Sequence, residues 1–116
     1  MPDDLRGLAE AWVAAWNARD LDRILALYTD DFEMTSPAIR EGGFDESGSL
    51  KGKPAVAAYW KAGLAKHTNL HFEAKRVYVS PSSIVINYRN ERGHAVCEYL
   101  RVNEAGLIVQ GAAHHA

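Results

Sequence analysis

Three polar side chains in the C-terminal half of the chain are suited to acid–base chemistry on a small molecule. Asn87 and Arg89 stand in one run rich in β-branched and aromatic residues, and Glu98 stands in the next. A glutamate can donate or accept a proton, while a neighbouring arginine or asparagine can orient it or polarise a substrate oxygen. If Arg92 and Gly93 form a two-residue turn, Glu98 lies opposite Asn87 and diagonal to Arg89 on one sheet face. We therefore expect Glu98, Arg89 and Asn87 to form the catalytic group.

A structural role for the same residues stays open. Arg89 and Glu98 could form a plain cross-strand ion pair, which contributes little when it is solvated. In the register just described, the opposite face of these strands carries Ile84, Ile86, Tyr88, Cys97 and Tyr99. A shift of one residue would exchange the two faces, so register decides what Glu98 meets.

The histidines show no metal-binding pattern. His67, His71 and His94 are scattered, with none of the spacings that zinc or iron sites use. We therefore expect no metal site. His114 and His115 are adjacent, so a strand would point them to opposite faces. Both suit a C-terminal surface, although His115 shares the parity of Gly111 and could reach a pocket rim.

The first half of the chain has the apolar spacing of helices. Residues 5–16 carry apolar side chains at steps of three and four, which predicts a helix capped by Asp3 or Asp4. Asp20 suits the N-cap of a second helix, whose apolar stripe is expected to reach Tyr28.

A strand and a third helix come next. Alternation over 32–36 predicts a short strand that Pro37 stops, and Pro54 suits the first turn of a helix. Residues 38–52 between them contain four glycines and show no clean period, so we expect a flap over a pocket.

The last third of the chain reads as an antiparallel meander. Strands are predicted at about 70–79, 83–91, 94–103 and 107–114, with turn residues between them. Helices segregated from an antiparallel sheet make an α+β fold, and each helix must bury its apolar stripe against the sheet.

Several segments resemble the nuclear transport factor 2-like superfamily, and within it the SnoaL-like group. They are AWNARDLD at 15–22, LYTDDF at 27–32, Ser36-Pro37, GKPAVAAYW at 52–60 and VNEAGLIV at 102–109. The resemblance covers nearly the whole chain and implies a single domain over 1–116. The superfamily's chemistry usually needs no cofactor, so none is expected. It implies a cone-shaped α+β barrel with three N-terminal helices packed on a curved, mostly antiparallel sheet around an apolar pocket.

The ketosteroid isomerases of this superfamily imply specific site positions. Their general-base aspartate would fall on Ser36, their oxyanion-hole tyrosine on Trp12 and their protonated aspartate on Glu98. A serine without a partner base cannot take a proton from carbon as a carboxylate does. We therefore expect no competent ketosteroid isomerase activity. The arginine-bridged carboxylates of the superfamily's epoxide hydrolases are also incomplete, because Ala112 and Ala113 stand where a second carboxylate is needed.

The resemblance favours the arrangement in which Glu98 points inward, beside small residues of the last strand. The expected ligand-binding residues are Trp12, Trp16, Tyr28, Met34, Ser36, Trp60, Gly111, Ala113 and His115. A few polar groups in an apolar cleft suit a small apolar molecule. The leading hypothesis is an isomerase, cyclase or hydrolase with Glu98 as acid or base. A non-catalytic ligand-binding or dimer-forming domain is the alternative.

Composition and charge limit the kinds of partner and the location expected for this protein. The 116 residues have a formal net charge of −2 with mixed signs, so no basic face for nucleic acid is expected. Neither a signal peptide nor a membrane span is apparent, and the one cysteine allows no internal disulfide, so we expect a cytoplasmic protein. Members of the superfamily often pair through the outer sheet face. An outer face with Ile84, Ile86 and Tyr99 would favour a homodimer.

Overall fold

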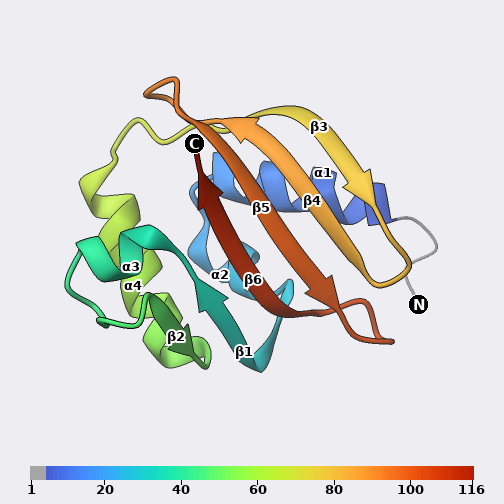
Figure 1. Cartoon of the computed structure of the whole chain (residues 1–116), viewed down its shortest axis with the longest axis horizontal. Helices are drawn as coiled ribbons and strands as arrows, with labels where there is room; N and C mark the ends of the chain where they lie inside the picture. Colours follow the sequence, from blue (N-terminus) through green and yellow to red (C-terminus); the bar gives the residue numbers. More distant parts are fainter. Residues whose placement is uncertain (1–4) are drawn as a thin grey trace.

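A curved six-stranded sheet with helices on its concave side makes up the cone-shaped α+β fold (Figure 1). The computed structural model describes residues 5–116, so the cap expected at Asp3 or Asp4 lies outside them. The strands are β1 (Tyr28–Thr35), β2 (Ser49–Lys51), β3 (Glu73–Val79), β4 (Ser83–Arg89), β5 (Ala95–Val102) and β6 (Ile108–His115). The helices are α1 (Leu5–Asn17), α2 (Leu21–Leu25), α3 (Pro37–Glu41) and α4 (Lys53–Lys66).

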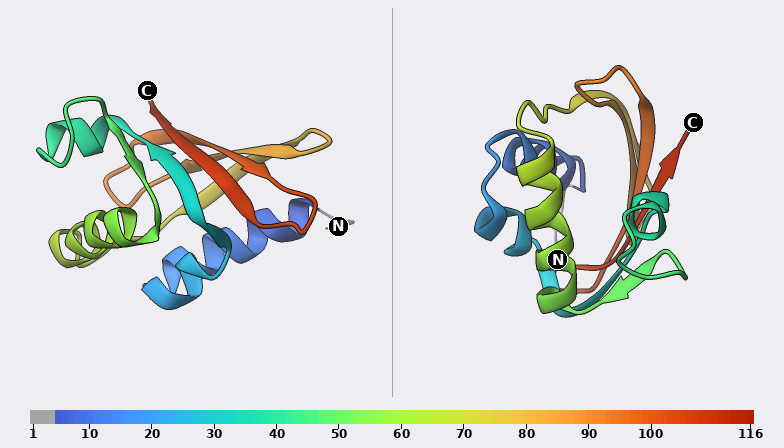
Figure 2. Two further views of the ribbon diagram at one scale, coloured as in Figure 1. Left: turned by 90° about the horizontal axis from the view of Figure 1, so that it is seen from below. Right: turned by 90° about the vertical axis from the view of Figure 1, so that its left-hand side faces the viewer.

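The sheet is mostly antiparallel, as expected. Its strand order is β2-β1-β6-β5-β4-β3, and only β1 and β6 run parallel. Figure 2 shows α1, α2 and α4 together on the concave side of the sheet. Among residues 5–116, no helix is long and apolar enough to cross a membrane.

The junction of α1 and α2 is held by polar contacts that the sequence suggested only in part. The Asp20 carboxylate accepts a hydrogen bond from the Arg23 amide at 3.1 Å, which confirms Asp20 as the N-cap of α2. Arg19, with a positive φ of 56°, donates to the carbonyls of His67 at 2.7 Å and Leu64 at 2.6 Å. This guanidinium satisfies carbonyls at the C-terminal end of α4 and ties that helix to α1.

The structure corrects the expected end of the second helix and adds detail to the segment after Pro37. The second helix ends at Leu25, and Tyr28 begins β1 because it pairs with Ile108 of the last strand. The segment expected to form a flap contains regular secondary structure. Ser36 caps the short helix α3, its hydroxyl accepting a hydrogen bond from the Ala38 amide at 3.2 Å. The rest of the segment adds β2 to the sheet edge.

The register of β4 and β5 differs by one residue from the expected one. Glu98 lies opposite Ile86, and Cys97 lies opposite Asn87. The connection is longer than two residues: Asn90 bonds across to His94, and Gly93 adopts a φ of +79°. An asparagine at the first position and a left-handed glycine at the fourth are typical of a type I turn closed by a glycine bulge.

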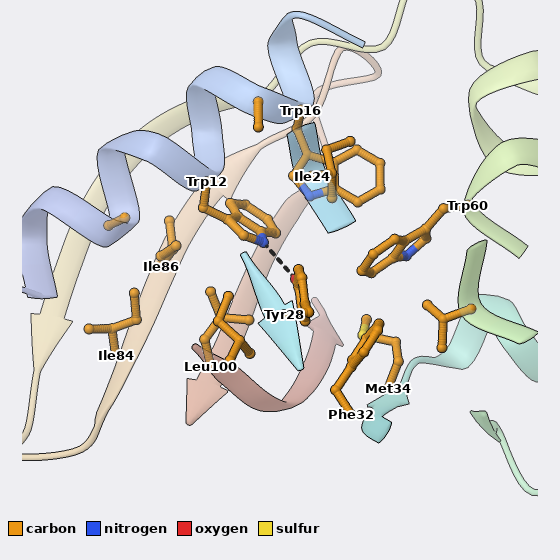
Figure 3. Packing of buried hydrophobic residues seen from close by; sticks show 14 of the residues in the cluster. Trp12, Trp16, Ile24, Tyr28, Phe32, Met34, Trp60, Ile84, Ile86 and Leu100 are labelled. Atoms are coloured by element: carbon orange, nitrogen blue, oxygen red, sulfur yellow. Dashed lines mark hydrogen bonds between the residues drawn. The ribbon is translucent and has the colours of Figure 1, made fainter. Parts of the chain in front are cut away.

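This register exchanges the faces of β4. Ile84, Ile86 and Tyr88 point into the core with Glu98, while Asn87 and Arg89 point outward. The outer face therefore lacks the isoleucines that favoured a dimer, although Tyr99 does lie on it. The core is rich in aromatic rings from α1, α4 and β1, and Trp12, Trp16, Trp60, Tyr28 and Phe32 crowd together there (Figure 3).

Candidate functional site

A cavity of about 320 Å³ lies between the helices and the concave face of the sheet. Its inner wall is apolar and aromatic, with Trp12, Trp16, Trp60 and Phe72 among the lining residues. Its rim carries polar residues from the end of α4 and the β4–β5 loop, including Lys66, His67, Glu91 and Arg92. The size and lining fit a small, mostly apolar ligand with a few polar groups.

Glu98 is the buried carboxyl of this cavity. Its side chain projects from β5 into the concave face, and the residue is only 3% exposed. It forms no hydrogen bond or ion pair with any residue from 5 to 116. Burial without a compensating partner raises the pKa of Glu98 from 4.5 to about 8. The side chain is therefore a neutral carboxylic acid at neutral pH and can donate a hydrogen bond.

Three tyrosine hydroxyls lie in the electrostatic neighbourhood of Glu98. Burial, followed by the charge of Glu98, raises the pKa of Tyr28 and of Tyr88 well above 10.0. Burial likewise raises the pKa of Tyr59, which a hydrogen bond with Ser36 lowers in part. All three phenols keep their protons at physiological pH. Tyr59 and Tyr88 line the cavity and offer a ligand two further donors.

Tyr28 lies behind the residues that line the cavity. Its hydroxyl accepts a hydrogen bond of 2.9 Å from the indole N–H of Trp12, drawn as a dashed line in Figure 3. This contact satisfies two buried polar groups and fixes the Trp12 ring against the cavity. Trp12 itself lines the cavity, whereas Tyr28 does not.

Most of the predicted ligand-binding residues do meet at this cavity. The ones that line it are Trp12, Trp16, Met34, Ser36, Trp60, Ala113 and His115, together with Glu98. Gly111 lies just behind the lining. A Cβ there would be 3.1 Å from the Met34 sulfur and 3.6 Å from a Glu98 carboxyl oxygen. Glycine thus leaves room for both side chains.

Asn87 and Arg89 are not part of the site. The Asn87 amide donates to the Cys97 sulfur at 3.4 Å, and the Arg89 guanidinium donates to the Gly93 carbonyl at 2.9 Å, both on the other side of the sheet. The expected arginine–glutamate pair is therefore wrong. The physical reason is the longer β4–β5 loop, which shifts β4 by one position.

Sequence reasoning missed Tyr88 and Tyr59 as site residues. Tyr88 was assigned to the wrong face by the register error, and the Asn90-to-Gly93 turn pattern was the signal that could have corrected it. Tyr59 stands beside Trp60 on α4, where its ring packs edge-on against Phe44 at 5.1 Å. Phe44, Ala38 and Gly42 line the cavity, so the 38–52 segment does border it. Within residues 5–116, no group of three or more potential ligands could hold a metal ion.

Comparisons with known proteins agree with this architecture. A family model described as the SnoaL-like domain matches residues 9–111. The chain belongs to the SnoaL-like family. A SnoaL-like protein of unknown function from Burkholderia thailandensis is 38% identical, with a TM-score of 0.90. That match covers 96% of this chain and 93% of the other.

More distant structures share only the fold with this SnoaL-like protein. A provisionally assigned ketosteroid isomerase from Kribbella flavida is 15% identical, with a TM-score of 0.75 over 96% of this chain and 76% of that one. A provisionally assigned polyketide cyclase from Sinorhizobium meliloti is 13% identical, with a TM-score of 0.75 over 98% and 95% of the two chains. No protein of curated function matches significantly.

Proposed function

We propose that this SnoaL-like protein binds a small, largely apolar molecule and transforms it by acid–base chemistry, in an isomerase- or cyclase-type reaction with Glu98 as proton donor. The observation that carries the proposal is the buried, unpaired carboxyl of Glu98 inside an aromatic cavity. Titratable groups in clefts whose pKa values are strongly shifted are candidates for catalysis, because burying an unpaired carboxyl costs free energy.

A neutral carboxylic acid is useful against a carbonyl oxygen. As negative charge develops on that oxygen, the proton of Glu98 stabilises it, and the hydroxyls of Tyr59 and Tyr88 are available as additional donors. Donors held in a cavity of low polarity act more strongly than donors in water. The reaction class supported best therefore passes through an enol or enolate.

Two more specific reactions of the superfamily are less well supported. Ser36 falls on the position of the ketosteroid isomerase base, but its hydroxyl caps α3 and no hydrogen bond within residues 5–116 joins it to a carboxylate. Arginine-bridged epoxide opening lacks its expected arginine, since Arg89 lies on the outer face and Arg92 at the rim pairs with Glu91. Neither activity is expected at an ordinary enzymatic rate.

The test compares Glu98→Gln with the wild type on a panel of small ketones, lactones and epoxides. Binding is read from the fluorescence of the tryptophans at the cavity, and turnover is read by mass spectrometry. Glutamine keeps the shape of glutamate but cannot transfer a proton. We expect affinity to stay within about threefold and turnover to fall by roughly 10²- to 10⁴-fold. Glu104→Gln, at an exposed carboxyl, is the matched control. Unchanged turnover in Glu98→Gln would refute the proposal.

A non-catalytic ligand-binding protein is the second candidate. The observation that favours it is the absence of any hydrogen bond from residues 5–116 that would orient the Glu98 carboxyl. Saturable binding without turnover of any compound, and equal affinity of Glu98→Gln, would support this candidate instead.

We also propose that the protein forms a homodimer through the outer face of the sheet. Ile84 and Ile86 face the core, so they cannot support this pairing. Its support is a row of outward-facing residues on the neighbouring strands β3, β4 and β5. They are Tyr78, Val85 and Tyr99, in direct cross-strand register, and Tyr78 is 54% exposed. A second copy would cover this apolar row.

A further inference from the structure

His115 stands at the same cavity as Glu98. It is the last residue of β6 and pairs with Val96, while Ala113, two positions earlier, pairs with Glu98. Both His115 and Glu98 line the cavity. Side chains at such diagonal positions of an antiparallel pair have Cβ atoms roughly 7 Å apart. The cavity therefore brings the Glu98 carboxyl and the His115 imidazole together on neighbouring strands, in addition to His67 and Glu91 at its rim.

The neighbouring histidine lies on the other face. His114 pairs with Cys97, and its ring Nδ1 lies 3.1 Å from the Ala112 carbonyl on the outward side of β6. His114 does not line the cavity. Alternation along the strand thus gives two adjacent imidazoles of which only one meets a ligand.

The surroundings of His115 favour the neutral form of its imidazole, although the residue is exposed overall. Burial is the largest cause that lowers its pKa below 6.5. Arg92 and His94 of the β4–β5 loop and His114 of its own strand also lower it, and Glu41 of α3 opposes them. A neutral imidazole has a free lone pair and can accept a proton.

The other histidine at the cavity is less suited to this role. His67 caps the C-terminal end of α4, and its Nδ1 lies 4.0 Å from the Glu91 carboxylate. It belongs to the polar rim, together with Glu91 and Arg92, and not to the strand that adjoins Glu98. Ser36, which falls on the position of the ketosteroid isomerase base, caps α3.

We propose that His115 is the general base that works with Glu98 on the enolisable carbonyl compounds of the proposed function. This inference rests on the proposed function, because it assigns Glu98 the acid role. A carbonyl oxygen within hydrogen-bond reach of Glu98 and an adjacent C–H facing His115 fit the spacing, since each contact spans about 3 Å.

The step balances within the site. A ring nitrogen of His115 takes the proton from the α-carbon, and the C–H electron pair forms the C=C bond. The C=O π electrons move to oxygen, which receives the proton of Glu98. The products are an enol, an imidazolium and a carboxylate. Return of the proton to the same carbon gives exchange, and its return to a conjugated carbon gives isomerisation. No oxidant or reductant is consumed.

The experiment follows exchange of α-protons for deuterium in 2-indanone and cyclohexanone by NMR, with affinity measured in parallel. We expect the wild type to accelerate exchange and His115→Gln to lose roughly 10²-fold or more of that rate while affinity changes less than about threefold. His114→Gln is the matched control and should keep the wild-type rate. The wild-type rate should also fall above about pH 8, where Glu98 loses its proton.

Each other outcome has a defined meaning. If His115→Gln exchanges at the wild-type rate while Glu98→Gln does not, the base lies elsewhere and the proposed function stands. Loss of exchange in His67→Gln alone would assign the base to His67 and overturn the inference. Full exchange in Glu98→Gln would refute the proposed function itself. No binding or exchange of either ketone by the wild type would overturn the substrate class.

Discussion

Replacing Glu98 with glutamine is expected to stabilise the protein by an amount that grows with pH. Burial raises the pKa of Glu98 from 4.5 to about 8. Between these values the folded protein holds a proton that the unfolded chain has released, so the folded state binds more protons. The stability that depends on the protonated Glu98 carboxyl is therefore fully present below pH 4.5 and is lost as the pH rises to about 8. Glutamine has no such dependence.

The magnitude follows from the two pKa values of this residue. At about 1.4 kcal/mol per tenfold change in proton activity, ionisation in the unfolded chain lowers the stability of the wild type by about 1 kcal/mol at pH 5 and about 4 kcal/mol at pH 8. The gap between Glu98→Gln and the wild type should thus widen by about 3 kcal/mol over this range. That is a large share of the roughly 5–15 kcal/mol that holds a domain together.

Urea unfolding at several pH values, followed by tryptophan fluorescence, measures this gap. Trp12, Trp16 and Trp60 are all buried, so their emission reports global unfolding. His67 and His115 have lowered pKa values, and the stability lost through them at acid pH occurs in both proteins and cancels in the difference. Glu104→Gln provides an exposed carboxyl as control.

A constant gap between pH 5 and pH 8 would refute the reasoning. It would mean that the carboxyl of Glu98 ionises inside the fold as readily as in the unfolded chain. Water or a polar partner would then reach the side chain, and the neutral acid on which the proposed chemistry depends would not exist at physiological pH.

Three further predictions concern stability and assembly. Arg19→Ala removes two charged hydrogen bonds at the end of α4 and should lower the free energy of unfolding by about 2 kcal/mol in urea titrations; no change would mean that water replaces them fully. Tyr28→Phe leaves the Trp12 N–H buried without its acceptor and should cost about 1–3 kcal/mol in the same assay, whereas a neutral result would indicate a new partner. Tyr99→Asp should turn a dimer into a monomer in light scattering, and a monomeric wild type at micromolar concentration would refute the pairing.

Much of the fold follows from local patterns. The period of α1, the cap at Asp20, the proline at the start of α4 and the turn residues between the last four strands each act within a few residues. Elements with such local causes were located within a few residues of their observed ends. The inward position of Glu98 was also expected, on the resemblance.

The residues that surround Glu98 could not be predicted from local patterns. A strand repeats every two residues, so one misjudged residue in the β4–β5 loop moved Asn87 and Arg89 into the site and Tyr88 out of it. Tyr28 lies in a strand because β6, which is distant in the sequence, pairs with it. The local spacing of apolar residues does not reveal that pairing. α3 and β2 are short and depend on the Ser36 cap and on pairing with β1.

The sequence by itself thus determined the α+β class, the aromatic wall and the presence of the candidate carboxyl Glu98 in the sheet, because these depend on composition and on periods along the chain. The tertiary structure decided which groups face that carboxyl. It exchanged an arginine and an asparagine for tyrosines, which changes the site from an ion pair to an unpaired, protonated acid. The physical reason is that the pKa of Glu98 depends on burial and neighbours in space, and these are set by register and by contacts between distant segments.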